Sequence, residues 1–526
     1  MSGPTSSFIG AKELNRIDYA IIGRRLPDEA YSDPKALTPK PNPILERLSP
    51  MPRPFSLLFF LLALLTGLVS PNIYALCAPA AVSCISTLDS LSIEALRSRE
   101  YQSSPSLIKQ LGGNDGLSEY ARHYSMDGTA PFQSYMVSYQ SDLRMVYARL
   151  DIPSTPMPIK GYPVIVFAHG WVGQEKAQYY NFGYDLTSLA GELINGYVDA
   201  GFIVITPGYL GHGTVDAVQA EGFDIMQSWD NATYLAPTFY AIDLLNLLEG
   251  LSFLNRTDWK KWATNKTLSP KANLSAINLS GHSQGGDVAL TALAVSGEDS
   301  SIKKPFAAAS IWSGNIPSRF TQLETFAPMA TTLQAFVSGD GTWTGTAKGR
   351  DNSINQSFIF PWPSDYIGTP DTSSPDWTWQ SEQWAEPSVE SVVRSRYKIM
   401  YDRINAQVED SEALSISIGI DDVGKLKVKH PLKFEQQILA IGGFAAVEFL
   451  TEPLVLHCSD RDYYSMPSWN LDLAKRITQQ GGNAKAFIYN GNTHGLKRSQ
   501  YSWFSPDDTA DGFPQAIKRD ILLFAH

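Results

Sequence analysis

The chain has 526 residues, of which 43% are hydrophobic and 18% are charged, and its formal net charge at pH 7 is -11. This balance is typical of a globular protein with a large core, because a disordered chain carries fewer apolar residues and more charge. A negatively charged protein repels a phosphate backbone on average, and the sequence has no basic stripe and no zinc-finger spacing. We therefore expect no nucleic-acid partner.

An uncharged, apolar run of about 15 residues occupies positions 55–69. Arg53 precedes it, and small residues around Ala75 and Ala78 follow it. A positive flank, a short apolar run and small residues are the layout of a secretory signal peptide, which we place at 51–76. The run is short for a membrane span, although an uncleaved N-terminal anchor is the alternative. We expect a secreted or periplasmic protein that meets a membrane only through this segment.

The signal-like segment begins late in the chain, after a proline-rich stretch. Met51 stands directly before it, so we interpret Met51 as the true initiator. Residues 1–50 are then a non-native or disordered extension.

Three cysteines are present in the chain. Cys77 and Cys84 could form a small disulfide in an oxidising compartment, which would leave Cys458 as an odd thiol. The alternative is three unpaired cysteines. No Cys/His cluster has the spacing of metal ligands, so we expect no metal.

From about residue 133 the chain alternates apolar strands with helical segments. Residues 134–140 and 143–153 alternate in the manner of half-buried strands. Residues 162–171 form a near-continuous apolar run that suits a strand buried on both faces. Later segments continue the pattern: helical spacing at 183–200, a strand at 202–211, an amphipathic helix within 234–254, and strands at 274–281 and 307–314. Such alternation predicts an α/β fold with a doubly wound, mostly parallel sheet.

The pattern breaks at 317–445, which is rich in Pro, Gly, Ser, Asp and Trp, and strands return at 447–460. We interpret the break as a cap inserted between strands of the sheet. The expected organisation is an N-terminal extension at 77–130, the first part of the core at 131–316, the cap at 317–445 and the second part of the core at 446–526.

The sequence Gly281-His282-Ser283-Gln284-Gly285 fits the pattern G-x-S-x-G. It follows an apolar strand and opens a helical segment, which is the setting of a nucleophilic serine on a sharp strand-to-helix turn. Glycine is needed on both sides because the turn leaves little room. We predict Ser283 as a nucleophile; the alternative is a plain glycine-rich turn.

A serine hydroxyl needs a base, and the chain has eight histidines. Only His494 lies in a polar, glycine-containing loop directly after a late strand, at 484–489. His282 sits inside the elbow and is expected to point away, and His457 lies within a strand as a core histidine. We predict His494 as the general base.

The base needs an acid that orients it. The strand that includes Cys458 runs into a loop with two candidates, Asp460 and Asp462. We favour Asp462 on loop register, with Asp460 as the alternative. The resulting chain order of Ser, Asp and His is that of an α/β-hydrolase.

A tetrahedral intermediate needs two backbone N–H donors. Gln284, directly after the nucleophile, is expected to supply one. Trp171, in the loop that follows the strand at 162–168, is expected to supply the other. His169 in the same loop is expected to be structural.

These motifs together resemble the α/β-hydrolase superfamily, over about 133–315 and 446–526. The stretch from 206 to 251 is similar to one in secretory lipases and esterases. The resemblance implies hydrolysis of carboxylic esters through an acyl-serine intermediate, without a cofactor. The insertion at 317–445 matches no cap that we can name.

The expected partner is a small ester. The tryptophans of the insertion either line an apolar or aromatic pocket for it or form the core of the cap. Two alternatives stay open. One is a serine peptidase of the prolyl-oligopeptidase type, although the N-terminal extension is too short for its propeller. The other is an inactive hydrolase fold that serves as a binding module.

Overall fold

The computed structural model describes part of the chain, and all described residues belong to the unit Ala75–His526. They are 85–111, 132–183, 189–229, 233–262, 269–303, 305–318, 321, 400, 403–404, 406–408, 417–420, 426–429, 431–459, 462, 465–489, 494–496 and 512–525.

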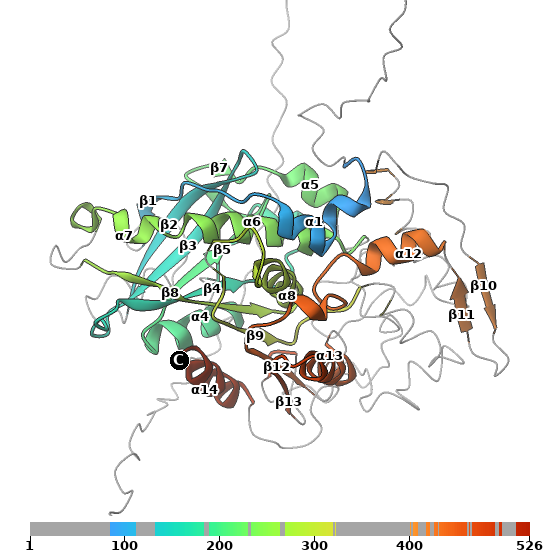
Figure 1. Cartoon of the computed structure of the whole chain (residues 1–526). Coiled ribbons are helices and arrows are strands. Elements are labelled where there is room, and N and C mark those ends of the chain that lie inside the picture. Colours follow the sequence, from blue (N-terminus) through green and yellow to red (C-terminus); the bar gives the residue numbers. More distant parts are fainter. Residues whose placement is uncertain are drawn as a thin grey trace, which may run out of the picture. The chain divides into compact units, whose positions relative to one another are not determined.

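A nine-stranded sheet forms the centre of the described part, in the order β1-β2-β3-β5-β4-β8-β9-β12-β13 (Figure 1). Its strands are β1 (Ser106–Gln110), β2 (Phe132–Ser141), β3 (Arg144–Pro153), β4 (Tyr162–Ala168), β5 (Ile203–Pro207), β8 (Ala272–His282), β9 (Ala308–Trp312), β12 (Leu454–Ser459) and β13 (Ala484–Tyr489).

The sheet is antiparallel at one edge and parallel over the rest. The pairs β1–β2, β2–β3 and β3–β5 are antiparallel, whereas β5–β4, β4–β8, β8–β9, β9–β12 and β12–β13 are all parallel. Because the chain first moves outward from β4 to β5 and then returns to β8, the parallel strands wind in both directions from β4. The predicted α/β fold with a doubly wound sheet is confirmed.

Helices cover both faces of the sheet, with α1, α6 and α8 on one side and α4 and α14 on the other (Figure 1). Alternate side chains of β4 point to the two layers: Val164 and Val166 pack with α6 and α8, while Ile165 and Phe167 pack with α4 and α14. The main helices are α1 (Ile93–Ser98), α4 (Leu189–Asp199), α6 (Ala236–Gly250), α8 (Gln284–Ser296), α13 (Pro467–Gln479) and α14 (Phe513–Phe524).

Shorter elements connect these layers. They are η1 (Leu88–Leu91), α3 (Gln174–Ala177), β6 (Thr214–Val215), β7 (Val218–Gln219), α5 (Phe223–Ser228), α7 (Phe253–Arg256), η2 (Trp259–Lys261), β10 (Ser417–Ile420), β11 (Leu426–Lys429), α12 (Leu432–Leu439) and η6 (Val447–Phe449).

Two elements are buried more completely than their sequences suggest. Helix α6 was expected to be amphipathic, but its polar residues Asp243 and Asn246 are buried together with its apolar ones. Strand β3 is buried along nearly its whole length rather than on alternate residues. Both lie between other layers, so their polar side chains are enclosed as well.

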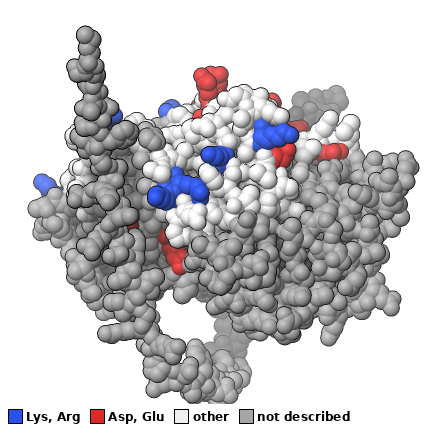
Figure 2. Space-filling model, turned by 90° about the horizontal axis from the view of Figure 1, so that it is seen from below, with Lys and Arg blue, Asp and Glu red and all other residues white. Residues whose placement is uncertain are grey.

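Several predicted features lie outside the described residues: the segments 1–50 and 51–76, the pair Cys77 and Cys84, and most of 317–445. Cys458 is buried. None of the described helices is long and apolar enough to cross a membrane. On the face seen in Figure 2, charged side chains are scattered singly among uncharged ones, without an extended patch of one sign in its described part.

Candidate active site

Ser283 stands at the junction between β8 and α8, where the chain turns sharply out of the sheet. Its backbone angles are φ 58° and ψ -124°, although it is not a glycine. A side chain with this φ is strained, and such strain persists only where the surroundings enforce it. The turn therefore holds the serine in the raised position of a nucleophile elbow.

Glycines on both sides make this turn possible. A Cβ atom on Gly285 would overlap with the carbonyl oxygens of Ala168 and His169 at the end of β4. A Cβ atom on Gly281 would overlap with the carbonyl oxygen of Gly285. The pattern G-x-S-x-G is thus a packing requirement, because the elbow touches backbone on both sides.

Backbone hydrogen bonds hold the elbow in place. The N–H of Ser283 donates to the carbonyl oxygen of Trp312 at 2.9 Å, and its own carbonyl oxygen accepts from Asn315 at 3.1 Å. A serine before a helix usually caps it through the side chain, but the hydroxyl of Ser283 makes no capping hydrogen bond. Ser283 as a residue is partly exposed rather than buried in the core.

Asp462 and His494 come together although they lie on different loops. The Nδ1 atom of His494 lies 2.8 Å from Oδ2 of Asp462, and the other carboxylate oxygen accepts from the N–H of Ser465 at 3.1 Å. The carboxylate is fully buried, whereas about a fifth of the His494 side chain is exposed. Since Nδ1 faces an acceptor, it carries the proton, and Nε2 is the nitrogen that can accept one.

His494 lies beside the elbow. Its ring centroid is 4.9 Å from that of His282, the residue directly before Ser283. The expectation that His282 points away is wrong, because its ring packs against the predicted base. Burial, together with the nearby charge of His494, lowers the pKa of His282 well below its usual range. His282 is therefore neutral and adds no positive charge beside His494.

The loop after β4, residues 169–171, also lies against the elbow, and we call it the oxyanion loop after its predicted role. A Cβ atom on Gly170 would stand 3.2 Å from Cβ of Ser283, so this peptide passes directly beside the serine. Trp171 follows, with its side chain about half exposed. Gln284 is the first residue of α8, where helix geometry directs N–H groups out of the N-terminal end. Both predicted donors thus belong to backbone that adjoins Ser283.

His169 supports this loop from within the core. Its ring is stacked between the rings of Tyr180 and Tyr209, with centroids 4.1 and 4.2 Å away. Its Nδ1 atom lies 2.7 Å from the carbonyl oxygen of Gly170. Burial lowers the pKa of His169 to about 3, so the ring is neutral. This arrangement agrees with the expected structural role of His169.

A second buried network, which sequence reasoning missed, ties the strand ends together. Asp520 of α14 accepts from Trp312 Nε1 at 2.7 Å and lies 2.9 Å from Nε2 of His457. It also accepts from the hydroxyl of Tyr197 at 2.6 Å, and His457 lies 2.9 Å from the hydroxyl of Tyr489. Asp520 thus joins β9 to β12 directly, and His457 extends the network to Tyr489 of β13.

The structure brings together Asp462 and His494, and it places Trp171 and Gln284 on the backbone beside Ser283. The alternative acid, Asp460, lies outside the described residues. Within the described part of the chain, no group of His, Cys, Asp or Glu is arranged to hold a metal ion.

No known family model matches the sequence, and no curated protein sequence matches it. The structure is similar to acetyl xylan esterase from Paenibacillus sp. R4, at a TM-score of 0.38 and 14% identity, covering 82% of this chain and 91% of that one. Acetyl xylan esterase 1 from a Thermoanaerobacterium species is similar at a TM-score of 0.38 and 12% sequence identity, and the match covers 84% of this chain and 95% of that one.

Acylaminoacyl peptidase from Pyrococcus horikoshii gives a TM-score of 0.39 and 13% identity, covering 76% of this chain. The match spans less than half of that peptidase, 42% of its length.

Proposed function

We propose that this protein is a serine hydrolase that cleaves carboxylic esters through an acyl intermediate on Ser283. The proposal is carried by one arrangement. A serine held at positive φ on a strand-to-helix elbow adjoins a histidine whose Nδ1 is already engaged by a buried carboxylate. The fold itself requires neither a strained serine nor an oriented base beside it, whereas acyl transfer requires both.

In the acylation step, Oγ of Ser283 attacks the carbonyl carbon while Nε2 of His494 takes the hydroxyl proton. Asp462 stabilises the imidazolium that forms. The N–H groups of Trp171 and Gln284 bind the oxyanion of the tetrahedral intermediate, with help from the N-terminal end of α8. His494 then returns its proton to the departing alkoxide, which leaves as an alcohol.

In the deacylation step, water attacks the acyl-serine and gives its proton to His494. The tetrahedral intermediate collapses, the carboxylic acid leaves, and Ser283 recovers the proton from His494. The cycle balances without a redox partner or a metal ion, since every proton passes through one imidazole.

An ester is proposed over a peptide because an alkoxide is a better leaving group than an amide nitrogen. Ester cleavage therefore demands less of His494 as a general acid than peptide cleavage does. The tryptophan-rich segment 317–445 supports an apolar or aromatic substrate. A panel of p-nitrophenyl esters and aminoacyl p-nitroanilides separates the two classes: we expect turnover of the esters, and faster turnover of the anilides would favour the peptidase alternative.

The test of the nucleophile is hydrolysis of p-nitrophenyl acetate by Ser283→Ala. We expect no turnover above the rate of buffer, with the fold kept, because alanine fits the same turn. Ser275→Ala is a matched control, since Ser275 is an exposed serine earlier on the same strand. Unchanged turnover by Ser283→Ala would contradict the proposal.

Export is proposed on the sequence of 51–76 alone. N-terminal sequencing of the native secreted product tests it. We expect a mature chain that begins after about residue 76, and a product that retains residues from 1–50 would contradict both the export signal and the role of Met51.

A further inference from the structure

Helix α6 carries a buried carboxylate that contacts the loop after β5, next to the oxyanion loop, rather than the predicted catalytic residues. Asp243 is only 1% exposed, and its two oxygens have different partners. Oδ1 accepts from the hydroxyl of Ser141 at 2.6 Å, and Oδ2 accepts from the backbone N–H of Leu210 at 2.8 Å. Burying a charge is costly, so a carboxylate in this place calls for a reason.

Leu210 belongs to the tyrosine loop, residues 208–213, which follows β5. The residue before it, Tyr209, has φ 62° and is completely buried. A tyrosine at positive φ is strained, and strain of this kind must be enforced by neighbours. Asp243 supplies that enforcement at the next residue, because its buried Oδ2 accepts the N–H of Leu210 at 2.8 Å and so fixes the backbone there.

The same face of α6 holds the side chain of Tyr209. Tyr240, one turn before Asp243, stacks on the ring of Tyr209 with centroids 4.6 Å apart and an interplanar angle of 6°. Helix α6 therefore contacts the tyrosine loop at two points, through the ring of Tyr240 and through the carboxylate of Asp243.

The tyrosine loop in turn holds the oxyanion loop. The ring of Tyr209 stacks on His169, and its hydroxyl donates to the carbonyl oxygen of His169 at 3.3 Å. Nε2 of His169 lies 3.4 Å from the carbonyl oxygen of Gly208. The peptide that follows His169, at Gly170, passes beside Ser283. A continuous set of contacts thus leads from the carboxylate to the oxyanion donors.

We propose that Asp243 is a positioning residue for the oxyanion loop. By fixing the backbone of Leu210 it holds Tyr209 against His169, and it thereby sets where the N–H of Trp171 stands relative to Ser283. The inference rests on the proposed function, because it assigns a role in binding the oxyanion of that reaction.

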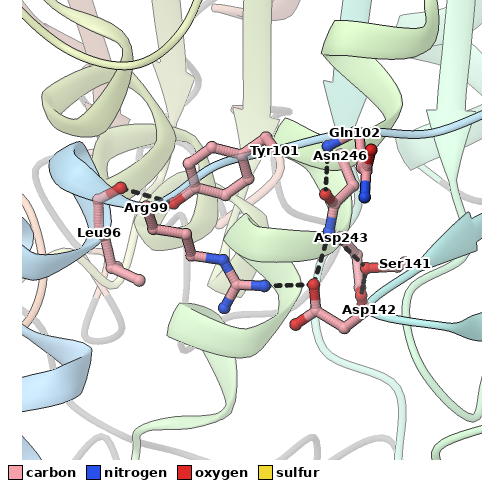
Figure 3. Close-up of polar contacts among 8 residues, drawn as sticks. All are labelled: Leu96, Arg99, Tyr101, Gln102, Ser141, Asp142, Asp243 and Asn246. Carbon is pink, nitrogen blue, oxygen red and sulfur yellow. Dashed lines mark hydrogen bonds and ion pairs between the residues drawn. The ribbon is translucent and has the colours of Figure 1, made fainter.

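A second group of contacts on α6 provides a matched control (Figure 3). Asn246, one turn after Asp243, accepts from the N–H of Gln102 and donates to Ser141 and Asp142, while Arg99 pairs with Asp142. These bonds hold the N-terminal segment and the turn between β2 and β3. Asn246 is as buried as Asp243. Among the described residues, Asn246 makes no hydrogen bond of its own to the tyrosine loop, and it reaches Asp243 only through the hydroxyl of Ser141.

The experiment measures kcat and KM for p-nitrophenyl acetate, and the inhibition constant of a trifluoromethyl ketone, whose hemiketal oxyanion imitates the intermediate. For Asp243→Ala we expect kcat to fall roughly 10- to 100-fold, with KM changed less than about threefold. The ketone should bind weaker by a similar factor. Asp243→Asn should recover most of kcat, since an amide can accept from Leu210 and donate to Ser141.

Asn246→Ala should lower the unfolding temperature but keep kcat within about twofold, because a loss of stability alone leaves the site of the folded molecules unchanged. If Asp243→Ala does not fold, Tyr209→Leu removes the ring stack instead and should give the same loss in kcat alone. Either variant, folded and with wild-type kcat and ketone affinity, overturns the inference. A wild-type protein that neither turns over the ester nor binds the ketone overturns the proposed function, and this inference with it.

Discussion

Asp462 and His494 meet through a single contact of 2.8 Å between Oδ2 and Nδ1, and this contact decides which imidazole nitrogen carries a proton. The carboxylate is buried, and its second oxygen accepts the N–H of Ser465. These two features hold the orientation of the carboxylate toward His494. With Nδ1 held by the carboxylate, Nε2 is the nitrogen that can accept a proton, which is what a general base requires.

Asp462→Asn should lower kcat roughly 10³- to 10⁴-fold while the unfolding temperature stays close to that of the wild type. An amide in this place can donate its own N–H to Nδ1, which favours the tautomer that cannot accept the serine proton. The measurement is steady-state hydrolysis of a p-nitrophenyl ester.

Two further substitutions accompany this one. Asp472→Asn, on the surface of α13, removes a carboxylate that pairs with Arg476 and should leave kcat unchanged. Asp460→Asn should also retain activity. If Asp460→Asn lost activity and Asp462→Asn did not, the assignment of the acid would be reversed.

Gly285→Ala should destabilise the fold by about 3 kcal/mol or more, because the new methyl group overlaps with backbone oxygens of Ala168 and His169 that cannot move aside cheaply. The measurement is denaturant unfolding. Gly481→Ala is the control: Gly481 has φ 88° and no atom near its missing Cβ, so only backbone strain of about 1 kcal/mol is expected. Equal losses for the two variants would refute the packing argument for the elbow.

Asp243→Asn should change how stability depends on pH. Burial raises the pKa of the Asp243 carboxyl to about 7, with a smaller contribution from Asp142, while its bonds to Ser141 and Leu210 and the charge of Arg144 oppose the rise. The folded protein holds this proton more tightly than the unfolded chain does. The cost of ionisation therefore appears as pH rises from about 4 to 7 and is complete above 7.

The asparagine variant has no such cost. Relative to the wild type, its free energy of unfolding should increase by about 4 kcal/mol between pH 4 and 8 and then level off. Chemical denaturation of both proteins across this range provides the measurement. A difference that does not depend on pH would show that the folded protein does not hold the proton of Asp243.

Asp520→Ala should cost at least about 3 kcal/mol of stability, because it removes the acceptor of Trp312 Nε1 and the partner of His457 Nε2 inside the core. Thermal unfolding tests this, with Lys518→Ala as a control on the exposed side of the same helix. A loss no larger than that of the control would mean that α14 is held by its apolar contacts alone.

Local sequence predicted the features that local geometry dictates. The elbow at Ser283 follows from two glycines, an apolar strand and a helical run, all within one short segment. The doubly wound sheet follows from the alternation of apolar strands with helical spacing, as in β4, β5 and β8. Such patterns follow from the geometry of a single helix or strand. They therefore predict the element without knowledge of the segments that pack against it.

The remaining features depend on how distant elements dock. His282 was expected to point away because nothing in the pentapeptide reveals that His494 arrives beside it. The pairing of His457 with Asp520 joins residues far apart in the chain, and each alone resembles an ordinary core or surface residue. Strand β1 was not predicted, for a similar reason. Its five residues are too few to show a strand pattern of their own, and they form a strand by pairing with β2.

The most direct test of the central claim is covalent labelling of the folded protein by a fluorophosphonate, followed by mass spectrometry of its peptides. The account predicts one adduct, on the peptide that contains Ser283, formed far more slowly in His494→Ala and absent in Ser283→Ala. No adduct on folded wild-type protein, or an adduct on a different serine that persists in Ser283→Ala, would contradict it.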